Sequence, residues 1–148
     1  MKQGWIPTAL ATALALAACG GNSDADFRDR AQAVCTTYAK QIEAIGTPSD
    51  ITQLADTSGK TADLLEKQIA ELEALEAPGS LAGDFAQWMK LNGEALTNAR
   101  AIQAAAGEQD QQRITELAGD AGRNTLSADR LARDLELPGC MIEPPEES

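Results

Sequence analysis

The chain of 148 residues contains no histidine, and this absence removes several classes of chemistry. Haem attachment through C-x-x-C-H, di-iron bundle sites built on Glu-x-x-His, classical zinc sites and Ser-His or Cys-His dyads all require histidine. No glycine-rich loop follows a strand pattern, so a phosphate cradle of that type is not expected either. We therefore expect a protein that is not an enzyme, with no cofactor and no metal site.

Basic residues are also scarce. The chain has 12 lysine and arginine residues against 23 aspartate and glutamate residues, which gives a formal net charge of −11. Nucleic acids and anionic lipid headgroups are bound through clustered positive charge, so this chain would repel both. We expect no nucleic-acid partner, and any attachment to a membrane has to use something other than a basic patch.

Large apolar residues form a small share of the chain beyond residue 18. Leucine, isoleucine, valine and phenylalanine account for 23 of those 130 residues, a proportion that approaches the composition of disordered chains. The same stretch holds 22 alanines, and alanine is the strongest helix former. We therefore expect ordered helices around a thin apolar core.

One apolar run begins at Ile6, after Lys2, and ends in Leu16-Ala17-Ala18-Cys19. Small residues before a cysteine at the end of such a run resemble a lipoprotein signal, or lipobox. The resemblance implies that the Cys19 thiol receives a diacylglyceryl group, that a signal peptidase cuts between Ala18 and Cys19, and that acyl chains hold the protein to a membrane. The alternatives are an ordinary signal peptide cut at an A-x-A-like site or a retained helix. A run of about 13 residues is too short to span about 30 Å of hydrocarbon.

Under this interpretation the chain has four segments. Residues 1–18 form the signal peptide, 19–23 the lipid anchor and a flexible tether, 24–140 a helical bundle, and 141–148 a disordered acidic tail. The 130 residues after the signal are enough for one domain with a single core. We expect an extracytoplasmic protein, lipid-anchored to a bacterial membrane.

Apolar residues recur at helical spacings of three and four through the bundle segment. Ser23, Thr47 and Ser80 are the predicted N-caps of the first three helices, and the helix-poor residues 57–59 predict a break or bend in the second. The predicted helices cover about residues 24–45, 48–76, 81–106 and 110–136. This pattern predicts an all-α antiparallel four-helix bundle, with a three-helix arrangement and a fragmented second helix as the alternative.

Two cysteines remain once Cys19 is assigned to lipid, and an exported compartment is oxidising. We predict a disulfide between Cys35 and Cys140, which would close a loop of about 100 residues and stabilise the fold by about 4–5 kcal/mol. Helices of equal length would place Cys140 at the tethered end and Cys35 about 15 Å from the opposite end. Either the first helix is displaced toward the tether with residues 46–50 extended, or bends shorten the other helices.

The bundle segment ends in Ala132-Arg133-Asp134-Leu135-Glu136-Leu137-Pro138-Gly139-Cys140, an Ala-x-x-Leu-x-Leu-x-x-Cys pattern. With a cysteine in the first helix and four alanine-rich helices, this pattern resembles small uncharacterised secreted lipoproteins of high-GC Gram-positive bacteria, over residues 27–140. Those proteins often have glycine where this chain has Glu136. The resemblance supports the disulfide and implies the outer face of the cell membrane rather than an outer membrane. It implies no catalytic activity.

Trp88 and Asn92 lie one helical turn apart in the predicted third helix. They could line a pocket with an aromatic wall and an amide, with Tyr38 facing them. The alternative is that all three pack in the core, where Asn92 would fix the register of the helices.

Two groupings of carboxylates are more typical of solvated helix faces than of a metal site: Glu71, Glu73 and Glu76, and Asp120, Asp129 and Asp134.

The missing catalytic groups leave two hypotheses for function. The first is a non-enzymatic interaction or structural module at the membrane, with an unidentified protein partner in the envelope. The second is a binding protein for a small apolar ligand or a cation held within the bundle.

Overall fold

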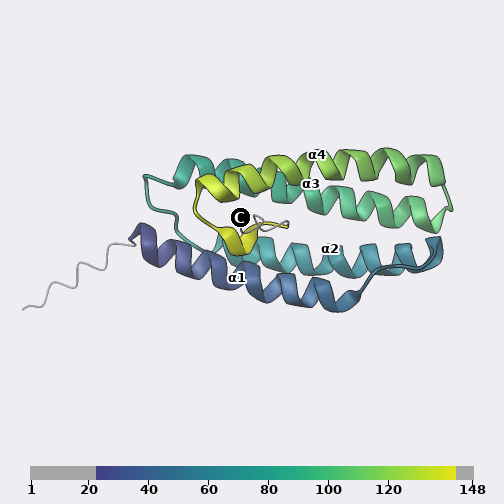
Figure 1. Ribbon diagram of the computed structural model, residues 1–148, viewed down its shortest axis with the longest axis horizontal. Helices are drawn as coiled ribbons and strands as arrows, with labels where there is room; N and C mark the ends of the chain where they lie inside the picture. Colours follow the sequence, from purple (N-terminus) through teal and green to yellow (C-terminus); the bar gives the residue numbers. More distant parts are fainter. Residues whose placement is uncertain (1–22, 143–148) are drawn as a thin grey trace, which may run out of the picture.

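Four long helices make up most of the computed structural model, which describes residues 23–142 (Figure 1). Consecutive helices run in opposite directions, and the described residues contain no β-strand. The predicted all-α antiparallel four-helix bundle is confirmed. Its elements are α1 (Asp24–Ile45), α2 (Ile51–Glu73), α3 (Ala82–Gly107), α4 (Gln111–Asp134) and a short 3-10 helix, η1 (Pro138–Cys140).

Side-chain caps begin three of the four helices. Ser23, Asp50 and Asp110 each accept a hydrogen bond from the backbone N–H three residues further on, at 3.1, 2.8 and 2.9 Å. Such bonds satisfy backbone donors that have no partner inside the helix. The predicted cap at Ser23 is therefore confirmed, whereas the cap of α2 is Asp50 and not Thr47.

The predicted cap at Ser80 is also wrong, because α3 begins after Leu81 without a side-chain cap. The Ser80 hydroxyl instead donates to the carboxylate of Asp24, with the shorter O···O distance 2.9 Å. This bond ties the turn before α3 to the start of α1.

The second helix runs unbroken through residues 57–59, so the predicted interruption and the fragmented-helix alternative are wrong. Gly59 is buried, and a Cβ on it would lie 2.5 Å from Nε2 of Gln103 on α3. Glycine at this position lets the Gln103 side chain approach the α2 backbone. Packing against α3 therefore holds a helix-poor segment in the helical conformation, as tertiary contacts often do.

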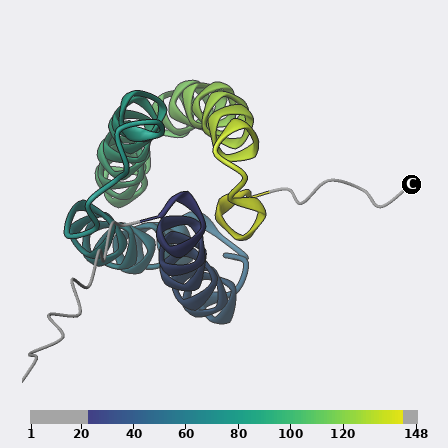
Figure 2. The same cartoon turned by 90° about the vertical axis from the view of Figure 1, so that its left-hand side faces the viewer.

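One side of the bundle is open. The first helix packs on α2, α2 on α3 and α3 on α4, but no Cα atom of α1 lies within 8 Å of a Cα atom of α4. The chain after α4 turns back into this opening, and η1 lies between α4 and α1 (Figure 2). We call residues Pro138–Ile142 the C-terminal strap. The strap occupies part of the place that an α1–α4 contact would fill in a closed bundle.

A disulfide joins Cys35 on α1 to Cys140 in the strap, with an S–S distance of 2.07 Å and Cα atoms 4.9 Å apart. Two features of the chain bring these residues together. The first helix ends well short of the end of the bundle at which α2 begins, and non-helical residues 46–50 cross that distance (Figure 1). The strap also runs back from the end of α4 to the middle of α1. The displaced first helix is therefore the arrangement found.

The reversal after α4 depends on a Schellman turn. The N–H of Leu137 donates to the carbonyl of Ala132 at 2.8 Å, and the N–H of Glu136 donates to that of Arg133 at 2.9 Å. Glu136 has φ 60°, in the left-handed region that favours glycine. This turn directs the chain after α4 back toward α1.

The best-packed part of the core lies at the end of the bundle where α1 begins. The rings of Phe27 and Phe85 meet edge to face there, with centroids 4.9 Å apart. Apolar residues nearer the opposite end, such as Ile42, Leu54 and Ile114, are only half-buried. The buried cluster consists of Phe27, Ala31, Cys35, Leu72, Leu81, Phe85, Trp88, Ala132, Leu135 and Leu137.

Candidate functional site

A partly open cavity of about 470 Å³ lies beside the opening between α1 and α4. All four helices and the strap contribute to its wall. Its volume falls within the range of about 300–1,000 Å³ that is typical of small-molecule sites. Much of the lining is aliphatic, from Ala39, Ile42, Leu65, Leu91, Ala95 and Ala128.

Three amide side chains, Gln68, Asn92 and Asn124, also line the cavity. Each donates its NH₂ group to another part of the protein, respectively to Cys35 Sγ at 3.6 Å, the Trp88 carbonyl at 2.9 Å and the Leu91 carbonyl at 2.8 Å. Oδ1 of Asn124 is buried and has no hydrogen-bond partner within residues 23–142. A buried acceptor without a partner costs about 1–3 kcal/mol, so a donor supplied to it would be stabilising.

Asp129 on α4 is the buried carboxylate of this site, with 8% of its surface exposed. Its Oδ1 accepts a hydrogen bond from the N–H of Ile142 at 3.0 Å, and it forms no ion pair with another described residue. Glu43, an exposed residue of α1, also belongs to the lining, to which no lysine or arginine of the described residues contributes. A buried carboxylate without a cationic partner is costly, so this wall favours positive charge.

The strap lies directly on α1 because Gly139 has no side chain. A Cβ at this position would lie 2.7 Å from Cγ of Gln32 and 2.9 Å from Oγ1 of Thr36, both closer than real Cβ contacts. The neighbouring Cys140 is bonded to α1, and Ile142 is hydrogen-bonded to α4. One wall of the cavity is thus fastened on both sides of the opening.

The structure brings two of the three predicted pocket residues together. Trp88 and Asn92 both line the cavity, and so do the disulfide cysteines. Tyr38 does not: it faces α2, where its hydroxyl donates to Oε1 of Glu71 at 2.7 Å. This hydrogen bond to a carboxylate raises the pKa of Tyr38 above its usual value of 10.0.

The predicted lipidation and cleavage residues, Cys19 and Ala18, lie outside the described residues.

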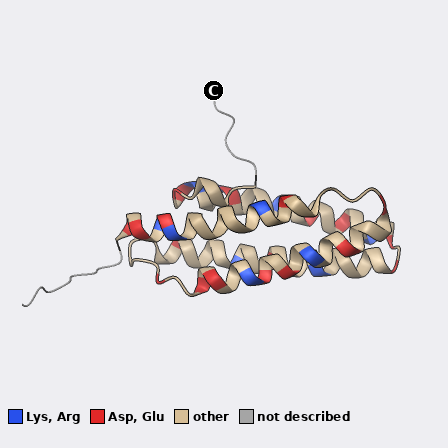
Figure 3. Ribbon diagram, turned by 90° about the horizontal axis from the view of Figure 1, so that it is seen from below, with Lys and Arg blue, Asp and Glu red and all other residues tan. Residues whose placement is uncertain are grey.

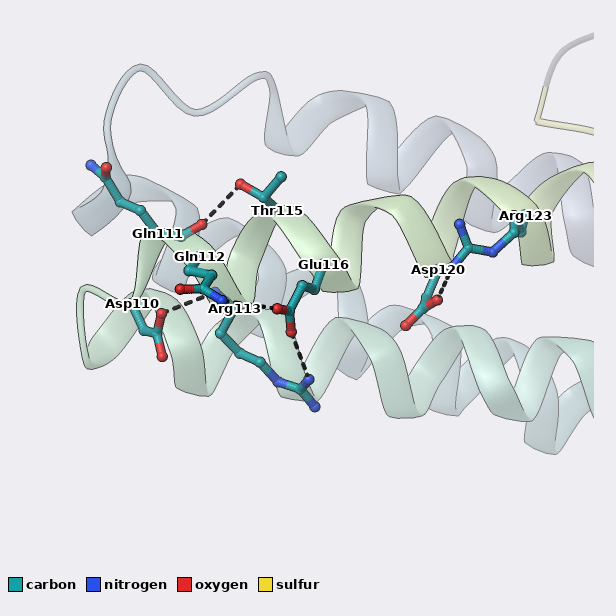
Figure 4. Close-up of polar contacts among 8 residues, drawn as sticks. All are labelled: Asp110, Gln111, Gln112, Arg113, Thr115, Glu116, Asp120 and Arg123. Atoms are coloured by element: carbon teal, nitrogen blue, oxygen red, sulfur yellow. Dashed lines mark hydrogen bonds and ion pairs between the residues drawn. The ribbon is translucent and has the colours of Figure 1, made fainter.

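The predicted carboxylate groupings do not converge. Figure 4 shows the outer face of α4, where Asp120 pairs with Arg123 and Glu116 pairs with Arg113 at 3.3 Å. Asp129 points instead toward the strap. Within residues 23–142, no three His, Cys, Asp or Glu side chains are grouped closely enough to hold a metal ion.

Charged residues are spread along all four helices, with lysines and arginines scattered among more numerous acidic residues (Figure 3). In the part of the chain that the structure describes, no helix is both long and apolar enough to cross a lipid bilayer.

Sequence reasoning missed Gln68 and Asn124 and assigned Asp129 to a solvated helix face, although each of the three carries a signal. Gln68 stands between Leu65 and Leu72 at spacings of three and four, and thus on the buried stripe of α2. Asn124 and Asp129 are polar residues close to the alanine stripe of α4. Polar residues on or beside a buried stripe, rather than the carboxylate-rich segments, were the informative feature.

Comparison with known proteins gives no relative from which a role could be transferred. No family model, no curated protein and no solved structure matches this chain.

Proposed function

We propose that this protein is a membrane-anchored, extracytoplasmic binding protein that holds a small, mainly apolar molecule in the cavity between α1 and α4. The cavity is the observation that carries the proposal. Protein interiors are normally packed to a density of about 0.74, with few voids larger than a water molecule. Here four helices and the strap line a partly open cavity of about 470 Å³ that the described residues do not fill.

The anchor in this proposal is the acyl-modified Cys19. Its support is the lipobox resemblance of residues 16–19. Because α1 begins at Asp24, five residues after Cys19, a tether of this length would reach only about 12 Å. The binding site would therefore stand close to the outer face of the cell membrane.

We propose no chemical reaction. The sequence lacks the common catalytic groups, and binding does not require them. A non-enzymatic interaction or structural module is the second candidate. Leu126 on α4 favours it, since this large apolar residue is 66% exposed. Single exposed leucines are common, however, so the cavity is the stronger observation.

Trp88 provides a direct test, because it is the only tryptophan after residue 18 and it lines the cavity. The mature protein would be placed in phosphatidylcholine nanodiscs and titrated with octanol while Trp88 fluorescence and the melting temperature are measured. Octanol at 100 times its Kd should stabilise the fold by about 2.7 kcal/mol. That stabilisation corresponds to roughly 8–16 °C in a domain of this size.

A matched pair of variants on α3 shows where the probe binds. Ala95 lines the cavity, whereas Ala86 is exposed and lies outside it. Ala95→Phe should fill the space and abolish the octanol response, and Ala86→Phe should leave it intact. An unchanged melting temperature in the wild type, or an equal response in both variants, would reject the binding function and leave the interaction module.

A further inference from the structure

We propose that the cavity selects ligands whose polar end is a protonated amine on an apolar body, and that it discriminates against ligands ending in a carboxylate or phosphate. This inference rests on the proposed binding function and adds the chemistry of the ligand to it.

The amides give the first reason. Gln68, Asn92 and Asn124 already use their NH₂ groups in hydrogen bonds to the protein. None of their carbonyl oxygens accepts a hydrogen bond from residues 23–142, and Oδ1 of Asn124 is buried. The Asn124 oxygen is therefore a buried acceptor in need of a donor, and the other two amide oxygens are free to accept a hydrogen bond from a ligand. An ammonium group offers three donors and no acceptor, whereas a carboxylate offers acceptors alone.

The carboxylates give the second reason. Asp129 is buried with one described hydrogen bond, to the N–H of Ile142, and no ion pair in the described chain. Glu43 on α1 also belongs to the lining, and no lysine or arginine among residues 23–142 does. An incoming cation would give the largely buried Asp129 a cationic partner that the described residues do not supply, while an anion would meet its negative charge.

The remaining lining decides between an organic cation and a metal ion. A metal ion needs several oxygen, nitrogen or sulfur ligands at short range, and no three His, Cys, Asp or Glu side chains of the described residues are grouped closely enough to supply them. The aliphatic side chains from all four helices would bury no apolar surface against a bare ion. They would gain from burying an alkyl or ring body, at about 25 cal/mol per Å² of apolar surface.

Three probes with one tail isolate the effect of the polar end. Octylamine, octanol and octanoate would be titrated at neutral pH into the mature protein in phosphatidylcholine nanodiscs, with Trp88 fluorescence as the readout and empty nanodiscs as the blank. We expect octylamine to bind at least about tenfold more tightly than octanoate, which is equivalent to about 1.4 kcal/mol. Octanol, which has one donor and no charge, should lie between them.

The variants locate the selectivity. Asp129→Asn keeps an oxygen that can accept from Ile142, so the strap should stay in place, and the preference for octylamine should fall severalfold. Glu43→Gln should reduce it less, because exposed charges are screened. Glu73→Gln, at the exposed end of α2 and outside the cavity, is the control and should change nothing.

The outcomes separate the two proposals. Equal affinity for the three probes, a preference for octanoate, or an unaltered preference in Asp129→Asn would overturn the amine selectivity while leaving the binding function intact. Failure of all three probes to bind would overturn both.

Discussion

Oδ1 of Asp129 on α4 accepts a hydrogen bond from the N–H of Ile142 at 3.0 Å, two residues beyond the cysteine that is bonded to α1. The strap thereby connects two helices whose Cα atoms nowhere approach within 8 Å. Because the same strap lines the cavity, the stability of the fold and the shape of the site depend on the same few residues.

Loss of the disulfide should be the largest single destabilisation. The bond between Cys35 and Cys140 spans 105 positions, and a cross-link of that length stabilises by about 4–5 kcal/mol on the chain-entropy model. Reduction should lower the melting temperature by well over 10 °C, as followed by circular dichroism. Replacing either cysteine by alanine should cost as much as replacing both. Two freely alkylated thiols in protein purified under oxidising conditions would contradict the bond.

Two glycine-to-alanine changes should have opposite effects on stability. Gly122→Ala on α4 meets nothing within 4 Å and should stabilise by about 0.5–1 kcal/mol, because alanine is the better helix former. Gly139→Ala should destabilise by about 1–3 kcal/mol, since its Cβ would collide with Gln32 and Thr36 and lift the strap from α1. Urea unfolding of the two variants measures both effects. Equal stability of the variants would mean that the strap does not pack as described.

Within residues 23–142, the two non-glycine residues with positive φ should accept glycine with a gain in stability. Gln109 and Glu136 have φ of 59° and 60°, and glycine there should gain about 0.5–1 kcal/mol. The gain should be smaller for Glu136→Gly, which also loses the exposed ion pair of Glu136 with Arg28 at 3.1 Å. Gln109→Ala is the control, because alanine keeps the unfavourable conformation. If it stabilises as much as Gln109→Gly, backbone strain is not the cause.

Tyr38 should titrate above pH 10. Its hydrogen bond to Glu71 favours the neutral phenol, and it is the only tyrosine of the chain, so absorbance at alkaline pH reports it alone. With the folded pKa above the unfolded one, this bond stabilises fully below about pH 10, and its contribution is lost as the pH rises through the folded value. Glu71→Gln should move the midpoint down toward 10.0. A midpoint that does not move would show that the carboxylate is not the cause.

Cys19→Ser should release the protein from the membrane or leave it unprocessed, because serine offers no thiol for the diacylglyceryl group. Fractionation of cells expressing wild type and variant, followed by intact mass, measures this. A processed variant that still partitions with membranes would reject the acyl anchor.

Helical periodicity predicted the elements well because spacing marks the face of each helix that is buried. It does not say which neighbour covers that face, and so it could not reveal that α1 and α4 stay apart. The cap of α2 was misassigned because Thr47, Ser49 and Asp50 can all cap a helix within four positions. The second helix continues through residues 57–59 because Gln103 packs on Gly59, a contact that forms only when the chain folds.

The site was predictable only in part for the same reason. Trp88 and Asn92 share one face of α3, and spacing is enough to place them together. Tyr38 belongs to another helix, and its direction depends on how far α1 is displaced along the bundle. The predicted disulfide allowed this displacement as one of two arrangements, but the path of the strap that decides between them is encoded by no local pattern.

Joining Cys35 to Cys140 makes a covalent ring of most of the folded chain. A protease that cuts once anywhere inside this ring, for example in the exposed turn before α4, separates no fragment from the remainder. Both pieces stay attached to the segment that leads back to residue 19, so under the proposed acyl anchor at Cys19 a nicked molecule would stay attached to the membrane. Damage of this kind would become visible on a gel only after the sample is reduced.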